Sequence, residues 1–372
     1  MNNLKMIYFF DDAFNASSGV GKKVLAQIKS FAKFGYEACL VFRYSNNIIL
    51  FNQNDMSYKT TSFSTTPAYY AKILDIIKKT ETKLVYSRKF LLNHFSMDFY
   101  KKLNNDIEDV KVIMEFPTIP YDEELSGDAL DVIDVDRYYR DKLHHYIKLS
   151  TNFSNLDEVF KIRSVKLVNG FDSQKVPMKQ IRKENDNKLN LVYVSSMYFW
   201  GGVERIISGL RNYYEQSYRK YIVDLYLVGD GSEISLYRKL TEEFGLQNRI
   251  FFHGCKTGTE LDSIIDQSDI GVCSLGLYKK KAIGGSLIKV AEYLARGLPI
   301  IFAFDNYAIP DDYRYALKFD NDPSDIGINE IIKFYDSISQ DQDFNSKIRT
   351  FAEENLTWDI NIKKVIDAIN AN

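Results

Sequence analysis

The segment Gly284-Gly285-Ser286-Leu287-Ile288-Lys289-Val290-Ala291-Glu292-Tyr293-Leu294-Ala295-Arg296-Gly297-Leu298-Pro299 predicts a helix with clear ends. Two glycines and Ser286 supply a loop and an N-cap, and Gly297 followed by Pro299 ends the helix about three turns later. One set of apolar side chains recurs at helical spacing and predicts a buried face: Leu287, Val290, Ala291 and Leu294.

The start of this predicted helix has the features of an anion site. A glycine-rich loop leaves backbone N–H groups pointing at a ligand, and the helix dipole favours negative charge there. Lys289 adds a positive charge suited to a diphosphate, and Glu292 projects from the same side, where a carboxylate can accept hydrogen bonds from ribose hydroxyls. A capped amphipathic helix with a surface Lys–Glu pair is the alternative, and spacing alone does not decide between them.

Length and composition limit the classes of protein to consider. A chain of 372 residues suits two domains, and 45% hydrophobic with 26% charged residues is typical of a soluble globular protein. The net charge of −2 gives no electrostatic case for a nucleic-acid partner. The sequence lacks a long apolar run and a signal-peptide layout, so we expect a cytoplasmic protein, with at most peripheral contact at the inner face of a membrane.

The cysteines predict the redox compartment. Cys39, Cys255 and Cys273 form no CxxC pair, so we interpret them as reduced core thiols in a reducing compartment.

The first half begins with a β-loop-α-β pattern. Residues 5–10 predict a strand, residues 22–34 a helix and residues 38–42 a second strand, with Gly19 and Gly21 at the turn where open α/β sheets bind ligands. These two glycines do not complete a dinucleotide fingerprint, which disfavours a nicotinamide-dependent oxidoreductase. They allow a substrate to approach the backbone.

Charged side chains follow two further predicted strands, residues 83–86 and 111–114. Arg88 and Glu115 therefore lie at the same rim of the sheet, where they either face a ligand cleft or form a surface ion pair. An Asp-x-Asp segment can hold a metal ion that bridges a nucleotide diphosphate, but no glycine loop adjoins Asp134-Val135-Asp136. We interpret it as solvated surface and predict no metal.

The second half repeats the alternation of strands and helices, which argues for a doubly wound parallel sheet in each half. The predicted organisation is an N-terminal domain over residues 1–178, a linker over 179–188, a C-terminal domain over 189–356 and a terminal helix over 357–372. That last helix has no sheet of its own to cover, so we expect it to cross back to the N-terminal domain.

At this point the chain resembles the GT-B glycosyltransferases of family 4. Besides the opening segment from Lys289 to Pro299, the second half carries these signatures in the order of the family: Val168-Asn169-Gly170-Phe171-Asp172, Trp200-Gly201-Gly202-Val203-Glu204-Arg205, Val228-Gly229-Asp230-Gly231, Phe252-His253-Gly254 and Gln267-Ser268-Asp269-Ile270. In the first half, Gly19-Val20-Gly21 and Glu115-Phe116-Pro117-Thr118-Ile119-Pro120-Tyr121-Asp122 fit looser patterns of the same group.

The resemblance implies two Rossmann-like domains facing a cleft, and a retaining transfer from a UDP- or GDP-sugar. The donor would be held mainly by the C-terminal domain, and a glycan or lipid-linked acceptor by the N-terminal one. Glu292 would bind the ribose. The other positions implied for the donor are Gly19, Gly21, Ser196, Gly202, Gly254, Gly284, Gly285, Ser286 and Lys289, with the loop from Gly254 to Gly258 as the wall for the base. No cofactor is expected, and the setting implied is synthesis of a cell-surface polysaccharide or glycoconjugate.

The chain departs from the family pattern in two places. The first of the family's paired glutamates would fall at Gly284, so the identity of the sugar does not carry over. The family's phosphate-binding Arg and Lys would fall near Ser196 and Gly201, where both charges are missing. Candidates to compensate are Arg88, Arg205, Lys289 and the run Lys279-Lys280-Lys281, although such a run is also typical of a solvated loop.

The expected mechanism is metal-independent. The helix N-terminus and Lys289 would stabilise charge on the departing diphosphate, Arg88 would contact the leaving phosphate, and Glu115 would contact the transferred sugar or the acceptor hydroxyl. A non-catalytic nucleotide-sugar-binding partner subunit with the same fold is the alternative. The base, the sugar, the acceptor and the oligomeric state stay open.

Overall fold

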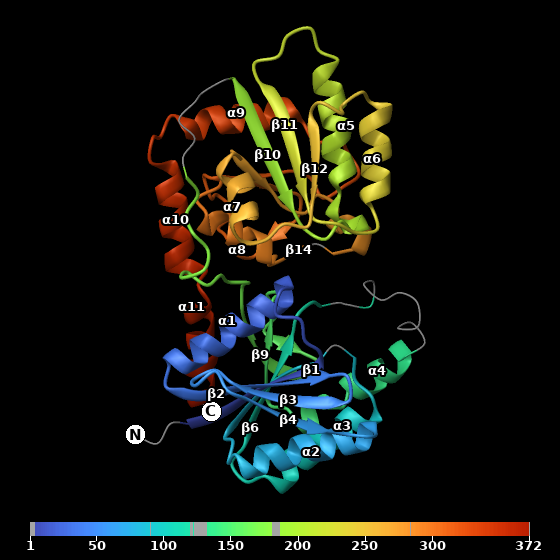
Figure 1. The fold of residues 1–372 in the computed structure, drawn as a ribbon, viewed down its shortest axis with the longest axis vertical. Helices are drawn as coiled ribbons and strands as arrows, with labels where there is room; N and C mark the ends of the chain where they lie inside the picture. The colour runs from blue at the N-terminus through green and yellow to red at the C-terminus, as the bar shows by residue number, and fades with distance from the viewer. Residues whose placement is uncertain are drawn as a thin grey trace. The chain divides into compact units, whose positions relative to one another are not determined.

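The computed structural model describes residues 4–89, 91–119, 122, 132–180, 187–282 and 284–371. The chain divides into two compact units. Unit 1 comprises Met1–Val168 and Trp358–Asn372, and unit 2 comprises Asn169–Thr357. Both units are α/β, with helices packed on the faces of a central sheet (Figure 1).

Unit 2 contains a six-stranded sheet in which every neighbouring pair is parallel. Its strands are β10 (Lys188–Val194), β11 (Ile222–Val228), β12 (Ile250–Gly254), β13 (Ile270–Val272), β15 (Ile300–Phe302) and β17 (Ala316–Lys318). They are ordered β12-β11-β10-β13-β15-β17, so the direction of winding reverses between β10 and β13. This is the strand order of a Rossmann fold, and it confirms the predicted fold class for this half.

Helices cover both faces of this sheet, which explains why β10 and β11 are rich in apolar residues. Three of them contribute to one buried cluster with the strands: α5 (Val203–Tyr214), α6 (Ile234–Glu243) and α9 (Ile328–Ser339). The remaining helices of the unit are α7 (Gly258–Asp266), α8 (Ile288–Ala295) and α10 (Phe344–Asn355), and α8 packs against α10.

Unit 1 contains a nine-stranded mixed sheet. Its strands are β1 (Leu4–Ala13), β2 (Tyr36–Tyr44), β3 (Asn47–Asn52), β4 (Tyr58–Ser62), β5 (Leu84–Arg88), β6 (Lys111–Phe116), β7 (Leu149–Asn152), β8 (Glu158–Val159) and β9 (Ile162–Lys166). The inner strands, in the order β2-β1-β5-β6-β7-β9, are parallel as predicted, whereas β3, β4 and β8 at the edges run antiparallel to their neighbours. Two-residue turns join β2 to β3 and β8 to β9, and so short a connection requires antiparallel pairing.

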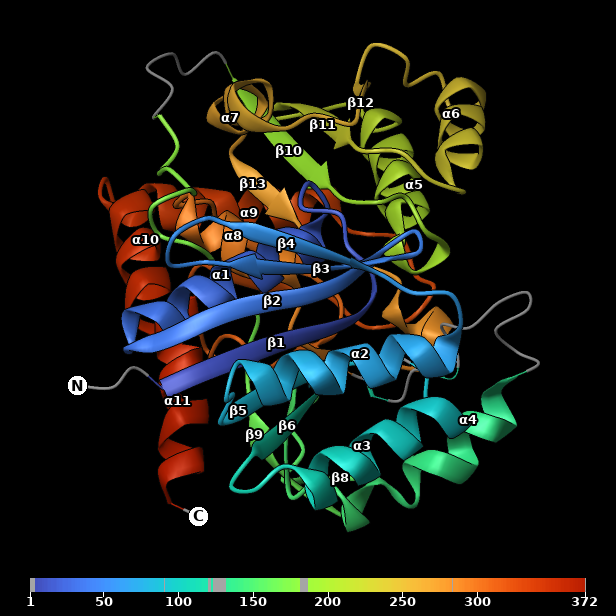
Figure 2. The same ribbon diagram turned by 60° about the horizontal axis from the view of Figure 1, so that its bottom comes forward.

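Two separate cores lie on the two faces of this sheet. One includes α2 (Thr66–Lys79) and α3 (His94–Asp106), which pack side by side (Figure 2). The other includes α1 (Gly19–Lys33) and the terminal helix α11 (Trp358–Asn370). A further helix, α4 (Ile133–Arg140), follows β6 along the chain. The terminal helix thus completes the N-terminal unit, with Trp358 and Ile362 buried beside the first strands.

The boundary between the units lies ten residues before the one we expected at 178, at Val168. Residues 169–180 belong with unit 2 because their backbone is bonded to it. Phe171 N donates to Leu356 O at 3.0 Å, and Lys179 N donates to Arg296 O at 2.9 Å. Of the predicted linker, residues 181–186 lie outside the described residues.

The three cysteines are free, and their surroundings differ. Cys273 is buried and Cys39 half-buried, as expected of core thiols, but Cys255 is exposed because it directly follows the end of β12. Within the described ranges, no helix combines the length and apolar character needed to cross a membrane.

Candidate functional site

The strand order of unit 2 reverses between β10 and β13. Open α/β sheets bind ligands at the carboxyl ends of the two strands beside such a reversal. The loops that leave these two strands are bonded to each other. Leu275 N donates to Gly201 O at 2.9 Å, and the Ser274 hydroxyl donates to Trp200 O at 2.7 Å. A Cβ on Gly202 would lie 2.4 Å from Gly276 N. Gly202 therefore lets the two loops approach.

The segment before α8 is built differently from the prediction. The helix begins at Ile288 with Leu287 as the N-cap, and Gly284–Gly285 form a short parallel strand, β14, with β16 (Asp305–Asn306). The Ser286 hydroxyl does not cap the helix because it accepts a hydrogen bond from Asn169 N at 2.6 Å. The predicted glycine loop with a serine cap was therefore wrong, although the helix lies where we expected it.

Tyr293 fixes α8 on the sheet. Its hydroxyl accepts a hydrogen bond from Val194 N at 2.7 Å and donates to Val192 O at 3.2 Å, so the helix is tied to β10. Its ring lies beside Gly271 of β13, where a Cβ would be 2.5 Å from the ring. These contacts decide where the two half-buried side chains of the same helix, Lys289 and Glu292, are held.

Lys289 lies close to both switch-point strands. Its ammonium is 4.0 Å from the ring centroid of Tyr193 on β10. Burial raises the pKa of the Cys273 thiol, just after β13, to about 12, and the positive charge of Lys289 opposes that shift. The predicted donor-site lysine therefore stands at the carboxyl end of β10 and β13.

A second lysine lies at this edge. Lys280, on the short helix η5 (Leu277–Lys280), has its ammonium 4.6 Å from the ring centroid of Trp200. Its neighbour Lys279 pairs with Glu204. Arg205, another candidate to compensate for the missing charges, is buried and donates to the carbonyls of Leu275, Asp320 and Ser324. We assign Lys280 to the site beside Lys289 because its ammonium also lies over an aromatic ring at this edge of the sheet.

The loop after β10 is closely packed at position 201. A Cβ on Gly201 would lie 2.5 Å from the hydroxyl of Tyr193. Ser196 in the same loop is exposed. Gly254, at the end of β12, has φ 64° and accepts a hydrogen bond from Gly229 N at 2.8 Å, which joins the ends of β11 and β12.

Unit 1 contains a buried ionic cluster around Glu115. Its carboxylate forms ion pairs with Lys23, at 3.2 Å, and with Arg88. It also accepts hydrogen bonds from Gln27 Nε2 at 2.8 Å and the Tyr86 hydroxyl at 2.9 Å. Burial alone would raise the pKa of Glu115, but the two positive charges and the two hydrogen bonds outweigh it and hold that pKa at about 2.

This cluster corrects both interpretations of Arg88 and Glu115. They do pair, but not on the surface, since the Glu115 side chain has no exposed area and that of Arg88 is 14% exposed. With both oxygens engaged, Glu115 has no free acceptor for a sugar or an acceptor hydroxyl in this structure. It joins α1 to β5 and β6, which is a positioning role.

The glycines at the first strand–helix turn also have a structural explanation. The helix α1 begins at Gly19 rather than at residue 22, and the Ser18 hydroxyl caps it by accepting from Gly21 N at 2.9 Å. A Cβ on Gly21 would lie 1.9 Å from Asn15 O. The backbone of Asn15 therefore fills the space beside Gly21 through which we expect a substrate to approach.

The two acidic residues of the Asp-x-Asp segment have different surroundings. Asp134 is exposed, as predicted, and pairs with Arg137 at 3.1 Å. Asp136 is fully buried, where it accepts a hydrogen bond from Leu92 N at 2.8 Å and pairs with Arg140 at 3.6 Å. The solvated-surface interpretation was wrong for Asp136. No group of three or more His, Cys, Asp or Glu side chains among the described residues is placed to hold a metal ion.

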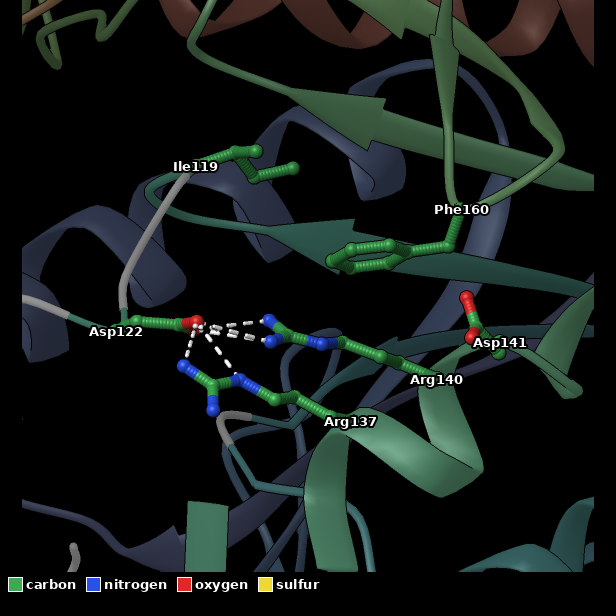
Figure 3. Close-up of a pocket in the computed structure, with 6 residues that line it drawn as sticks. All are labelled: Ile119, Asp122, Arg137, Arg140, Asp141 and Phe160. Atoms are coloured by element: carbon green, nitrogen blue, oxygen red, sulfur yellow. Dashed lines mark hydrogen bonds and ion pairs between the residues drawn. The ribbon is translucent and has the colours of Figure 1, made fainter. Parts of the chain in front are cut away.

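A pocket of about 390 Å³ in unit 1 had no signal in the sequence (Figure 3). Three segments that are far apart in the chain line it: the loop after β6, the end of α4 and the β8–β9 turn. Its lining residues are Ile119, Asp122, Arg137, Arg140, Asp141 and Phe160. Only the fold brings them together.

Part of unit 2 is similar to a known protein family. Residues 175–313 match the family described as glycosyl transferases group 1. This range contains both switch-point loops and the whole of α8.

One relative and several solved structures are also similar to this chain. An uncharacterized glycosyltransferase of Methanocaldococcus jannaschii is 28% identical over 189 residues, which is 50% of this chain and 46% of that relative, so the alignment spans less than half of its length. A glycosyltransferase from Rickettsia africae is 14% identical with a TM-score of 0.67 and covers 99% of this chain and 98% of its own. The catalytic domain of starch synthase IV from Arabidopsis thaliana, bound to ADP and acarbose, is 10% identical with the same TM-score, with 98% of each chain covered.

The residues that match this family thus include the predicted donor-site residues of unit 2. Lys289 and Glu292 lie on α8, and Lys280 lies on the loop before it. Two half-buried lysines over aromatic rings, at the carboxyl edge of a Rossmann-type sheet, form an electropositive position suited to a phosphorylated ligand.

Proposed function

We propose that the chain is a glycosyltransferase that moves a sugar from a UDP- or GDP-sugar to an acceptor hydroxyl, with retention at the anomeric carbon and without a metal ion. This proposal rests on the position of α8 among the residues that match the group 1 glycosyl transferases. Lys289 and Glu292 of this helix lie at the switch point of the sheet. The similar starch synthase domain, which is bound to ADP and acarbose, supports a nucleotide and a glycan as ligand classes.

In this proposal the donor diphosphate lies at the amino end of α8. Transfer breaks the bond between the anomeric carbon and the diphosphate oxygen, and the electron pair leaves on that oxygen. The acceptor oxygen bonds to the anomeric carbon on the face that the diphosphate leaves, which retains the configuration, and its proton passes to the departing diphosphate oxygen. The helix dipole and Lys289 stabilise the charge that develops on the leaving diphosphate, which is the largest electrostatic contribution available at this site.

Two further side chains have roles in the proposal. Glu292 accepts hydrogen bonds from the donor ribose, from a position one helical turn after Lys289. Lys280 adds a second positive charge, since the loop after β10 has none at Ser196 or Gly201. Arg88 is retained as a candidate for the leaving phosphate, whereas Glu115 is assigned to positioning.

The proposal includes the acceptor, the product and the cellular location. The acceptor is a glycan or a lipid-linked glycan, and the product is a cell-surface polysaccharide or glycoconjugate. The protein acts in the cytoplasm, with peripheral contact at the inner face of the membrane.

The test is release of nucleoside diphosphate from a panel of UDP-, GDP- and ADP-sugars. The wild-type protein is expected to hydrolyse one donor slowly without acceptor, and Lys289→Ala and Glu292→Ala are expected to lower that rate by about 10²-fold or more. Lys239→Ala, on the exposed side of α6, is the matched control and retains the rate. Unchanged turnover in both site variants would refute the assignment.

A non-catalytic nucleotide-sugar-binding subunit is the second candidate. The loop after β10 favours it, because neither Ser196 nor Gly201 supplies the positive charge that the family pattern has at these positions. Thermal-shift binding of a nucleotide without any release of diphosphate would support this candidate over the first.

A further inference from the structure

Two side chains that line the pocket in unit 1 are held in place by contacts with their neighbours. Its aliphatic wall, Ile119, is held by Ser154, whose hydroxyl accepts from Ile119 N at 3.2 Å and donates to Ile119 O at 3.1 Å. Its aromatic wall is Phe160, whose ring makes an edge contact with Phe116 of β6 at 5.2 Å between centroids. A volume of about 390 Å³ is within the range of small-molecule sites.

Hydrogen bonds join the polar side chains of the pocket. Arg140 donates to both oxygens of Asp122 at 3.0 and 3.1 Å, and Arg137 donates to Asp122 Oδ2 at 2.9 Å from Nη2 and 3.2 Å from Nε (Figure 3). Hydrogen bonds from Arg140 are the main cause of the lowered pKa of Asp122. The carboxylate therefore stays ionised and keeps both guanidinium groups oriented.

The charges of this pocket do not favour an anion. Two arginines and two aspartates line it, and Asp134 and Asp136 pair with the same arginines from outside the lining. A phosphate or carboxylate would enter a site without surplus positive charge. A neutral ligand that both donates and accepts hydrogen bonds suits this lining better.

Phe160 occupies an unusual backbone position. It has φ 48° and its neighbour Lys161 has φ 63°, so the two-residue turn between β8 and β9 is one in which Gly and Asn are preferred. A bulky residue in this backbone conformation costs free energy. The ring also lies 5.1 Å from the guanidinium carbon of Arg140. This strained turn thus places the apolar ring of Phe160 directly beside the polar side chains of the pocket (Figure 3).

We propose that this pocket binds one pyranose unit of a neutral carbohydrate. The C–H face of the sugar packs on the ring of Phe160. The hydroxyls of the sugar bond to Asp141 and to the outer atoms of the hydrogen-bonded group formed by Arg137, Asp122 and Arg140. The binding itself is independent of the proposed function. The role of the bound sugar as part of the acceptor rests on that function.

The experiment is ligand-observed NMR with methyl α-D-glucopyranoside, methyl α-D-galactopyranoside and methyl N-acetyl-β-D-glucosaminide on the full-length protein. At least one glycoside is expected to bind. Phe160→Leu, which keeps an apolar side chain but removes the ring, is expected to weaken it about three- to tenfold. Asp141→Ala, at an exposed position, weakens binding without a threat to folding.

Lys161→Asn is the matched control, because it alters the same turn without lining the pocket and is expected to leave the affinity unchanged. Inorganic phosphate is the charged probe. Tighter binding of phosphate than of every glycoside, or equal sugar affinity in wild type and both pocket variants, would overturn the proposal. Sugar binding in a protein that hydrolyses no donor would support the pocket and count against the glycosyltransferase function alone.

Discussion

The ring of Tyr293 fills the space that Gly271 leaves empty, since a Cβ at Gly271 would lie 2.5 Å from that ring. Together with the two hydrogen bonds of its hydroxyl to β10, this contact sets the position of α8 on the sheet. Lys289 and Glu292 are carried by that helix, so the geometry of the proposed donor site depends on a packing contact that touches no ligand.

Gly271→Ala is expected to destabilise the protein by about 1–3 kcal/mol, because the added methyl forces the buried Tyr293 ring and α8 away from the sheet. The measurement is urea unfolding. Gly285→Ala is the comparison, since a Cβ there meets no atom within 4 Å, and its free energy of unfolding should stay within about 0.5 kcal/mol of wild type. Equal effects of the two substitutions would contradict the packing argument.

Glu115 is expected to make the protein acid-sensitive in a defined range. Its pKa falls from 4.5 to about 2 on folding, so the folded state binds this proton less readily than the unfolded state. The stabilisation, about 3 kcal/mol, is complete above pH 4.5 and is lost as the pH falls towards 2.

The measurement for Glu115 is the free energy of unfolding between pH 6 and pH 2.5. Glu115→Gln should lower stability at pH 6, where it leaves Lys23 and Arg88 without their shared carboxylate, and should flatten the acid slope relative to wild type. Parallel pH profiles for the two proteins would show that Glu115 does not carry this dependence.

The two aspartates of the Asp-x-Asp segment are expected to respond differently to the same substitution. Asp136→Ala leaves Leu92 N–H buried without its acceptor and should cost about 1–3 kcal/mol. Asp134→Ala, whose side chain is 89% exposed, should change stability by less than about 0.5 kcal/mol. Thermal unfolding of the two variants measures the difference, and a larger loss in Asp134→Ala would oppose the burial argument.

Lys280→Ala is expected to lower kcat/KM for the nucleotide-sugar donor by about tenfold, because one of the two lysines at the switch point no longer opposes the diphosphate charge. Lys280→Arg should retain most of the activity. Lys239→Ala again serves as the control for loss of a lysine in the same unit. If Lys280→Ala and Lys239→Ala gave the same rate, Lys280 would have no part in the site.

Local patterns determined much of the fold. Apolar runs bounded by glycine predicted the alternation of strands and helices in unit 2, but not its short strands β14, β16 and β17. The helix with Lys289 and Glu292 lies where its periodicity placed it. Such features depend on neighbours within about one or two turns of the chain, so a sequence can encode them visibly. The short polar strand β4 and the two-residue strand β8 lacked this signal.

The tertiary structure decided how the polar residues are used. Glu115 is ionised and buried because Gln27, 88 residues away, and Lys23 reach it from another element. Ser286 bonds to Asn169, 117 residues away, and so does not cap α8. The pocket around Phe160 joins three separate segments. Sequence determined which elements form, because their periodicity is local. Burial and hydrogen bonding of single polar groups depend on distant partners, which only the packed fold supplies.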